Sequence, residues 1–162
     1  MTYRVLFVCM GNICRSPAAE AVLLHAVRRL GLAVDVDSAG TIGIHAGELP
    51  DLRMRAAGKS RGYELTSMAR EVTPRDLQPD IFGWVIAMDR KNLDHLLRLA
   101  AQLPQPRRAS PRIVLLSDFL DASWPRDVPD PYYGGPDGFE RVLDMLEAAT
   151  PAILKSLTEA TV

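Results

Sequence analysis

The chain has 162 residues, 48% of them hydrophobic and 24% charged, with 19 lysines and arginines against 20 aspartates and glutamates. This balance predicts one globular domain over residues 1–162 with a core of its own. The net charge of −1 excludes the basic surface that general nucleic-acid binding needs, and no apolar run is long enough to cross a membrane. Two cysteines and a poor match to a signal peptide predict a cytoplasmic protein, which we expect to be a monomer.

Apolar periodicity and capping residues predict the elements along the chain. Residues 3–9 form a nearly continuous apolar run, which is typical of a strand covered on both faces. Ser16 before Pro17 predicts a helix start, with Ser16 as its N-cap and Gly31 as its stop. We expect further strands at 34–38, 84–88 and 113–116, helices at 51–62, 90–101 and 139–157, and a proline-rich loop at 104–111. The alternation in 34–38 indicates an edge strand, and Pro151 predicts a kink or break in the last helix.

Strands that alternate with helices predict an α/β fold. The expected architecture is a four-stranded parallel sheet with helices on both faces and a phosphate-binding loop between the first strand and the first helix. Reactive groups in such sheets gather at the carboxyl ends of the strands. Cys9, Ser38, Asp89 and the stretch after Leu116 all lie at predicted strand ends, so we expect the site there.

Residues 9–16, here called the phosphate loop, join the first strand to the first helix. A short loop around a helix N-terminus points backbone N–H groups inward, and these donors together with the helix dipole bind an anion. Gly11 permits close approach of the backbone, and Asn12 tolerates a left-handed conformation. The predicted phosphate-binding members of the loop are Met10, Gly11, Asn12, Ile13, Cys14 and Ser16.

Three side chains of the phosphate loop indicate covalent catalysis. A cysteine at a helix N-terminus beside an arginine favours the thiolate, so Cys9 is predicted to be the nucleophile. Arg15 offers a planar fork for two phosphoryl oxygens, and the hydroxyl of Ser16 can donate to the sulfur. A lone cysteine is more often an inert core residue. The Gly-Asn loop and the Arg-Ser-Pro helix start that follow Cys9 favour the nucleophile instead.

Asp130 is the predicted proton donor for the leaving oxygen. It lies between two prolines in a long loop after the fourth predicted strand, and long loops at this sheet edge are often functional. Its carboxyl is expected to act first as general acid and then as general base on water. Tyr132 and Tyr133 are expected to wall the cleft and stack on an aromatic substrate. The segment alone is typical of a plain turn, and the phosphate loop is what favours the catalytic interpretation.

With these segments, the chain resembles the low-molecular-weight protein-tyrosine phosphatase family nearly from end to end. The matching motifs, in the family's order, are Val5–Pro17, Ser38-Ala39-Gly40-Thr41, Ala69-Arg70, Met88-Asp89 with Asn92-Leu93, and Asp130-Pro131-Tyr132-Tyr133-Gly134. The resemblance implies a four-stranded parallel sheet and hydrolysis of phosphotyrosine, on a protein or a small aryl phosphate, through a phosphocysteine, with no cofactor and no metal. It implies that Asn12 and Ser38 hold the loop in shape. It also implies that Cys14 forms a reversible disulfide with Cys9, which prevents over-oxidation.

The sequence departs from the family pattern at two places. Ser67 stands where many members have a histidine that supports the loop asparagine. Ile44 and His45, which we expect at the rim of the substrate cleft, stand where many members have an aromatic residue. The first departure concerns the support of the phosphate loop, and the second concerns substrate preference.

Four other functions fit the sequence less well. A thiol-dependent arsenate reductase needs further cysteines. Phosphoarginine phosphatases tend to have threonine where this chain has Ile13, and a non-catalytic phosphoryl carrier has no use for Asp130. A zinc site is disfavoured because Cys9 and Cys14 do not have the spacing of zinc ligands. The three histidines also show no paired ligand pattern; they are His25, His45 and His95. Asp89 is predicted to be structural, either as a helix cap or paired with an arginine near the site, Trp84 to pack in the core, and Trp124 to direct the long loop. The residues predicted to be solvated surface charges are Arg53, Arg55, Arg61, Arg107 and Arg108.

Overall fold

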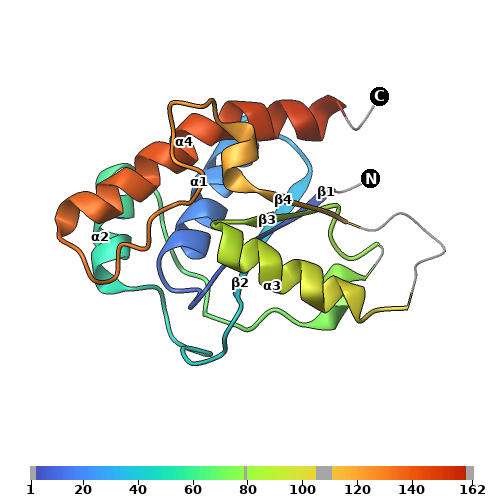
Figure 1. The fold of residues 1–162 in the computed structure, drawn as a ribbon. Helices are drawn as coiled ribbons and strands as arrows, with labels where there is room; N and C mark the ends of the chain where they lie inside the picture. Colours follow the sequence, from blue (N-terminus) through green and yellow to red (C-terminus); the bar gives the residue numbers. More distant parts are fainter. Residues whose placement is uncertain (1–2, 79, 105–110, 160–162) are drawn as a thin grey trace.

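The computed structural model describes residues 3–78, 80–104 and 111–159, and Figure 1 shows the resulting fold. Four parallel strands form one sheet in the order β2-β1-β3-β4. The strands are β1 (Tyr3–Cys9), β2 (Val34–Gly40), β3 (Trp84–Ala87) and β4 (Arg112–Leu115). The helices are α1 (Arg15–Arg29), α2 (Leu52–Ser60), α3 (Arg90–Ala101) and α4 (Pro136–Glu159), with short 3₁₀ turns η1 (Pro74–Leu77) and η2 (Leu116–Phe119).

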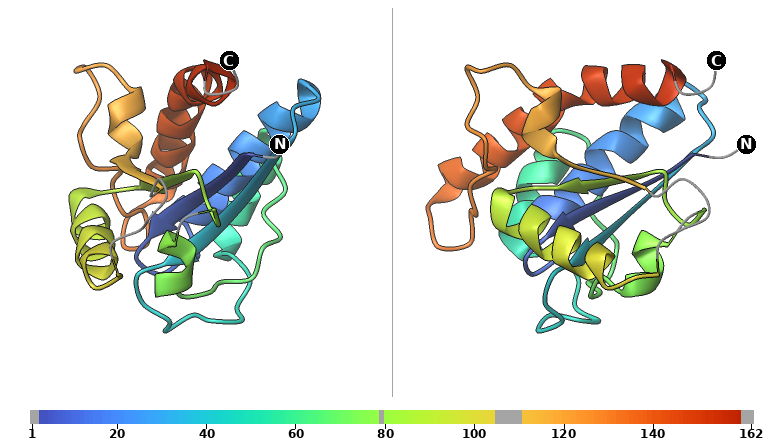
Figure 2. Two further views of the ribbon diagram at one scale, coloured as in Figure 1. Left: turned by 90° about the vertical axis from the view of Figure 1, so that its right-hand side faces the viewer. Right: turned by 45° about the vertical axis from the view of Figure 1, so that its right-hand side comes forward.

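The helices cover both faces of the sheet, as Figure 2 shows, with α1 and α4 on one side and α3 on the other. Successive side chains of a strand point to opposite faces. In β1, Val5 and Phe7 therefore pack into the core under α1 and α4, whereas Leu6 and Val8 pack into the core with α3. This double burial explains the continuous apolar run at the N-terminus. The predicted α/β fold is confirmed, and β2 is an edge strand as its alternation indicated.

The predicted N-cap of the first helix is wrong. Helix α1 begins at Arg15, and Cys14 occupies the N-cap position without a capping hydrogen bond from its side chain. Ser16 lies inside the first turn, where its hydroxyl contacts the sulfur of Cys9 rather than a backbone N–H. The helix start is thus left uncapped by side chains, which keeps its N–H groups available for an anion.

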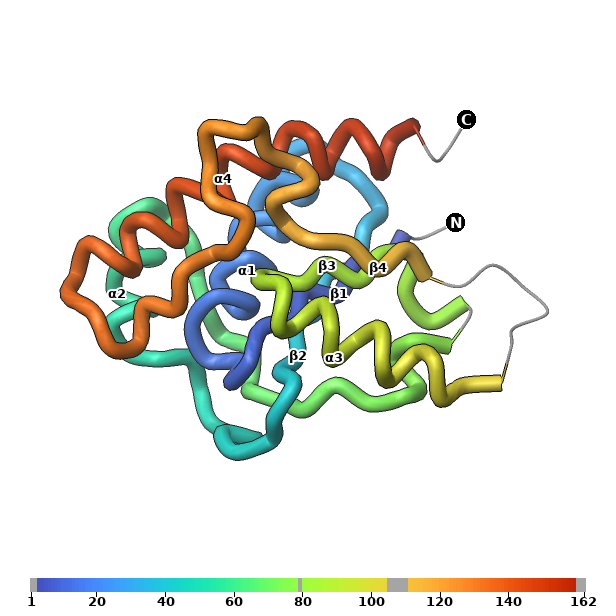
Figure 3. Tube along the Cα trace, viewed as in Figure 1, coloured from blue at the N-terminus to red at the C-terminus, as the bar shows by residue number. Residues whose placement is uncertain are grey.

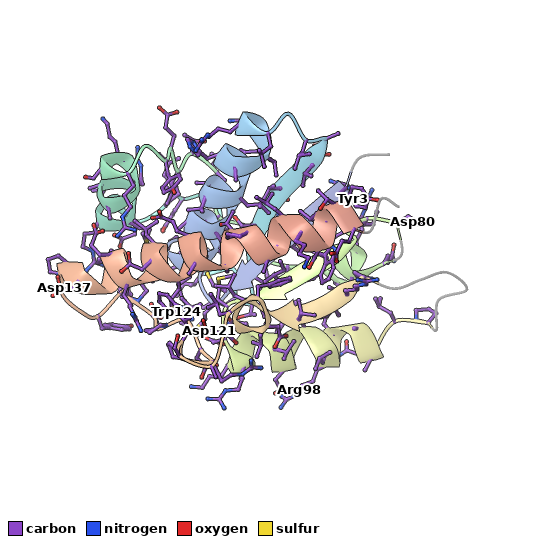
Figure 4. All side chains as sticks on the ribbon, turned by 90° about the horizontal axis from the view of Figure 1, so that it is seen from above. Tyr3, Asp80, Arg98, Asp121, Trp124 and Asp137 are labelled. Atoms are coloured by element: carbon purple, nitrogen blue, oxygen red, sulfur yellow. The ribbon has the colours of Figure 1, made fainter. Side chains whose placement is uncertain are left out.

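Of the predicted kink or break at Pro151, the break does not occur, because helix α4 continues through this residue. The helix begins at Pro136 rather than at Phe139. A proline inside a helix costs about 3 kcal/mol. Beyond it, Ile153 and Leu157 are 3% and 2% exposed, and burying two such side chains contributes about 3–6 kcal/mol. Packing against the core therefore outweighs the local cost. Figure 4 shows α4 lying across one face of the sheet.

Arg61 is not the solvated surface charge that the sequence predicted. Its guanidinium lies just beyond α2 and contacts three carboxylates along α4, at 2.5 Å from Glu140, 2.9 Å from Asp144 and 2.5 Å from Glu147. This network ties α2 to α4. Arg107, Arg108 and most of the predicted loop at 104–111 lie outside the described residues. In the part of the chain described, no helix combines the length and apolarity that a membrane crossing needs.

Candidate active site

Cys9 is the last residue of β1, and its sulfur faces the phosphate loop. The side chain is 2% exposed. The sulfur lies 2.9 Å from the hydroxyl oxygen of Ser16 and accepts a hydrogen bond from the backbone N–H of Asn12 at 3.3 Å. Both contacts come from the loop and the first turn of α1. The sulfur is thus placed at the base of the loop, where negative charge on it is stabilised by hydrogen bonds and by the helix dipole.

Asn12 holds the phosphate loop in shape. Its φ of 57° lies in the left-handed region, which asparagine tolerates better than most residues. Its amide nitrogen donates to Ser16 Oγ at 2.8 Å and to Ser38 Oγ at 3.0 Å, and its amide oxygen accepts from the backbone N–H of Arg70 at 2.9 Å. The hydroxyl of Ser38 in turn donates to Glu20 at 2.6 Å. The amide therefore connects the loop to α1, β2 and the segment after α2.

Close packing of β2 against the loop depends on Gly40. A Cβ at this position would stand 2.6 Å from the backbone oxygen of Met10, which is closer than real contacts allow. Ser67, the departure from the family pattern, lies close enough to Glu20 to oppose the rise of its pKa, while the amide oxygen of Asn12 accepts a hydrogen bond from the backbone N–H of Arg70. The phosphate loop is therefore supported by the backbone N–H of Arg70 and by the carboxylate of Glu20. Burial raises the pKa of Glu20 above its usual range, although Ser38 and Ser67 oppose the shift.

Arg15 is 4% exposed, and the Nη1 group of its guanidinium donates hydrogen bonds to two acceptors within the protein. Its Nη1 donates to Asp89 Oδ2 at 2.6 Å and to the backbone oxygen of Val128 at 3.0 Å. The predicted pairing of Asp89 with an arginine is confirmed. Burial opposes the positive charge, but Cys9 and Asp89 raise the pKa of Arg15 above its usual value. The Nε and Nη2 groups remain to hold two oxygens of a phosphoryl group.

Asp130 lies near Arg15, in the segment 120–135 between η2 and α4, here called the acid loop, which Figure 3 traces. Its Oδ2 is 3.9 Å from Arg15 Nη2, and its Oδ1 accepts from the backbone N–H of Tyr132 at 3.1 Å. Its side chain is 37% exposed. The carboxylate is therefore both within reach of the phosphate loop and open to the cleft. Trp124, labelled in Figure 4, packs against the core in the same loop and carries Arg141 over its ring at 4.8 Å.

A cleft of about 240 Å³ opens above the sulfur. Tyr132 and Tyr133 form one wall, with ring centroids 4.9 Å apart in a T-shaped arrangement. Ile44, 72% exposed, and His45 lie on the rim. The cleft is lined by Cys9, Met10, Gly11, Ile13, Cys14, Arg15, Ile44, His45, Asp130, Tyr132 and Tyr133. The predicted residues Asn12, Ser16 and Ser38 lie behind this lining, where they contact the loop.

Cys14 also lines the cleft but differs from Cys9. Burial, and then the charges of Asp51 and Cys9, raise the pKa of Cys14 to about 12. Its thiol stays protonated at neutral pH, so it does not compete as a nucleophile. Among residues 3–78, 80–104 and 111–159, no cluster of His, Cys, Asp or Glu is arranged to hold a metal ion.

Two residues beside the cleft, Asp51 and Arg53, were not expected to contact the acid loop. Arg53 was predicted to be only a solvated surface charge, but it also binds Asp51 and Tyr132. Asp51 is the N-cap of α2, and its side chain accepts from the backbone N–H groups of Arg53 and Met54. Arg53 reaches the backbone oxygen of Tyr132 in the acid loop. The Asp51 cap was visible in the sequence as an acidic residue before a helix, but nothing local indicates the contact to the acid loop.

A parallel α/β sheet whose first strand ends in a thiol, at the base of an amide-lined loop with a buried arginine, defines the class of cysteine-based phosphatases. The family model described as "Low molecular weight phosphotyrosine protein phosphatase" matches residues 4–162. The chain therefore belongs to this family.

Similar proteins span nearly the whole chain. A putative low molecular weight protein-tyrosine-phosphatase of Synechocystis is 42% identical over 95% of this chain and 96% of its own length. The crystal structure of a protein tyrosine phosphatase from Entamoeba histolytica has a TM-score of 0.87 and 40% identity, and it covers 99% of this chain and all of that one. The crystal structure of a Drosophila arginine phosphatase has the same TM-score, 33% identity and coverage of 94% and 96%.

Proposed function

We propose that this chain, acting as one domain, hydrolyses phosphotyrosine in proteins, or in small aryl phosphates, through a phosphocysteine intermediate at Cys9. The observation that carries the proposal is the environment of the sulfur. It lies within hydrogen-bonding distance of Ser16 and Asn12 at the base of the phosphate loop, beside the buried guanidinium of Arg15. Such a site places a nucleophile directly below a bound phosphoryl group.

In the first step, the thiolate of Cys9 attacks phosphorus and the bond from phosphorus to the tyrosine oxygen breaks. The departing oxygen takes a proton from the carboxyl of Asp130, so tyrosine leaves neutral. Arg15 Nε and Nη2, together with the loop N–H groups, hold the equatorial oxygens as charge redistributes. Because Nη1 is already bound to Asp89 and Val128, the guanidinium is fixed before the substrate arrives.

In the second step, Asp130 takes a proton from water, and the water oxygen attacks phosphorus. The bond from phosphorus to sulfur breaks, inorganic phosphate leaves, and the electron pair returns to Cys9 as thiolate. Ser16 lies 2.9 Å from this sulfur and can donate its proton to the developing negative charge. The hydroxyl therefore makes the sulfur a better leaving group.

The walls of the cleft support an aromatic substrate. Ile13 and Tyr132 line the same cleft as Cys9, and an aromatic ring between apolar walls gains both burial and ring contacts. The similarity to the Drosophila arginine phosphatase makes phosphoarginine the comparison to include. Ile13 favours the aromatic ring, because it offers a guanidinium no hydrogen bond.

The proposal extends to oxidation and to the setting of the enzyme. A peroxide converts the Cys9 thiolate to a sulfenic acid. The thiol of Cys14 then attacks this sulfur and releases water, leaving a disulfide that a thiol reductant reopens. Cys14 is protonated while Cys9 is a thiolate, partly because the charge of Cys9 raises its pKa. Conversion of Cys9 to a neutral sulfenic acid removes that charge and so favours the Cys14 thiolate, which is the attacking species. We place the enzyme in the cytoplasm as a monomer, where reductants restore Cys9.

The test is a comparison of phosphotyrosine, phosphoarginine and phosphoserine peptides on wild type, Cys9→Ser and Asp130→Asn. We expect turnover of phosphotyrosine to exceed that of the other two peptides. Cys9→Ser should abolish turnover while vanadate still binds, and Asp130→Asn should lower kcat/KM by about a hundredfold or more. Residual hydrolysis by Cys9→Ser would rule out covalent catalysis at this residue. Faster turnover of phosphoarginine than of phosphotyrosine would overturn phosphotyrosine as the proposed substrate.

A further inference from the structure

The acid loop has no regular secondary structure between η2 and α4, yet it must hold the Asp130 carboxyl at a defined place. On one side of Asp130, the loop is anchored at Val128. The backbone N–H of Val128 donates to the backbone oxygen of Met88 at 3.0 Å, and its own oxygen accepts from Arg15 at 3.0 Å. Val128 is 1% exposed, so this anchor is buried and firm.

On the other side of Asp130, the loop is anchored at Tyr132 by Arg53. Arg53 Nη1 donates to the backbone oxygen of Tyr132 at 3.1 Å. The guanidinium carbon also lies 5.3 Å from the ring centroid of Tyr132 and 4.9 Å from that of Phe139 at the start of α4. One arginine thus contacts both the acid loop and the helix that follows it. Removing it frees the loop on one side of the proton donor.

Arg53 is itself held in place by Asp51. Its Nε and Nη2 donate to the two carboxylate oxygens of Asp51 at 3.1 and 2.9 Å, a bidentate pair that fixes the plane of the guanidinium. The hydrogen bond from Arg53 lowers the pKa of Asp51, so the carboxylate is charged at neutral pH. With Nε and Nη2 bound to Asp51, Nη1 points to Tyr132.

The same residue connects to the phosphate loop. The backbone N–H of Asp51 donates to the backbone oxygen of Ile13 at 2.8 Å. A short path of hydrogen bonds therefore runs from Ile13 in the phosphate loop through Asp51 and Arg53 to Tyr132 in the acid loop. This path connects the loop that carries Cys9 to the loop that carries Asp130. It runs through the first residues of α2 and does not involve Arg15.

We propose that Arg53 is a positioning residue for the proton donor: it holds the acid loop so that the Asp130 carboxyl meets the leaving oxygen of the substrate. The proposal rests on the function proposed above. Arg53 does not touch the reacting atoms, so it acts on the steps in which Asp130 moves a proton. The affinity of the phosphate loop for a phosphate analogue does not depend on it.

The leaving group of the substrate separates this role from a general structural one. Phenyl phosphate needs a proton on its departing oxygen, whereas 2,4-dinitrophenyl phosphate leaves readily as the anion. Full loss of a general acid costs about 10²–10⁴-fold in rate, and a displaced one costs part of that. We expect Arg53→Ala to lower kcat/KM for phenyl phosphate about tenfold and to leave the value for 2,4-dinitrophenyl phosphate within about twofold.

The decisive experiment is a double-mutant cycle of Arg53→Ala with Asp130→Asn, assayed on phenyl phosphate. If Arg53 acts through Asp130, its removal changes the activity of the Asp130→Asn enzyme by less than about twofold, because the group that it positions is already gone. Wild type and Asp130→Asn are compared first. Equal rates for those two enzymes would overturn the assignment of Asp130 as proton donor. The Arg53 proposal is decided by the rates of Arg53→Ala and of the double variant.

Arg55→Ala is the matched control, since Arg55 lies in the same helix and lines a different cleft; it should leave both substrates unaffected. Arg53→Lys keeps the positive charge and a hydrogen-bonding ammonium group but not the planar fork, so it should lose less activity than Arg53→Ala. It also replaces the alanine variant in the test if that variant fails to fold. Full additivity in the cycle, equal losses on both substrates, or weaker vanadate binding would each overturn the proposal. Wild-type kinetics in folded Arg53→Ala would do the same.

Discussion

Replacing Ser16 by alanine tests the hydroxyl that faces the sulfur of Cys9, the proposed nucleophile. Ser16 is fully buried, and its oxygen lies 2.9 Å from Cys9 Sγ and 2.8 Å from Asn12 Nδ2. The change removes one oxygen from a closed network and adds no group that could clash. Asn12 keeps its bonds to Ser38 and Arg70, so we expect the loop to retain its shape.

The size of the effect follows from the charge on the sulfur. A hydrogen bond to a charged group contributes about 1.5–3 kcal/mol, which corresponds to a rate change of about tenfold to a hundredfold when it is lost from a transition state. The sulfur recovers its negative charge as the phosphocysteine is hydrolysed, so this step should slow most. One N–H of Asn12 also loses its acceptor, and the free energy of unfolding should fall by about 1–2 kcal/mol.

Stopped-flow kinetics with p-nitrophenyl phosphate separates the two chemical steps. We expect Ser16→Ala to keep a burst of p-nitrophenol, about equal to the enzyme concentration, followed by a steady state slowed by about tenfold or more. The control is Ser117→Ala, because Ser117 is also buried and its hydroxyl makes no hydrogen bond within the described part of the chain. A steady-state rate in Ser16→Ala within about threefold of wild type would refute the role of the hydroxyl in releasing the sulfur.

Three further substitutions test other parts of the molecule. Burial raises the pKa of Glu20, so the stability that it contributes is present below its unfolded value of about 4.3 and is lost as the pH rises through the folded value. Glu20→Gln should therefore gain stability relative to wild type as the pH rises above about 4.3; urea unfolding that shows a difference independent of pH would contradict the raised pKa of Glu20. Cys14→Ser should turn over within about twofold of wild type but should not recover with dithiothreitol after peroxide, and full recovery would exclude Cys14 as the resolving thiol. Arg61→Ala should leave kcat unchanged and lower the free energy of unfolding by about 1 kcal/mol in urea. An unchanged free energy of unfolding would mean that the three carboxylate contacts of Arg61 do not stabilise the packing of α2 against α4.

The parts of the fold that depend on local pattern followed from the sequence. The apolar run of β1, the glycine and asparagine after it, and helix α1 are adjacent in the chain, and adjacent residues are constrained by backbone geometry and periodicity alone. Where tertiary packing competed with a local preference, the local pattern misled. Pro151 predicted a kink or break, but α4 continues through it with buried residues beyond. Ser16 predicted a cap, but the sulfur of Cys9 takes its hydroxyl.

By itself, the sequence determined the order of strands and helices and placed Cys9 in a loop between the first strand and the first helix, because these features are set by residues that are neighbours along the chain. Only the tertiary structure decided how Asp130 reaches the loop. Its position depends on Arg15 binding the backbone of Val128 and on Arg53 binding that of Tyr132. Backbone oxygens carry no signature in the sequence, since every residue has one. Contacts of this kind become visible only when folding brings distant segments together.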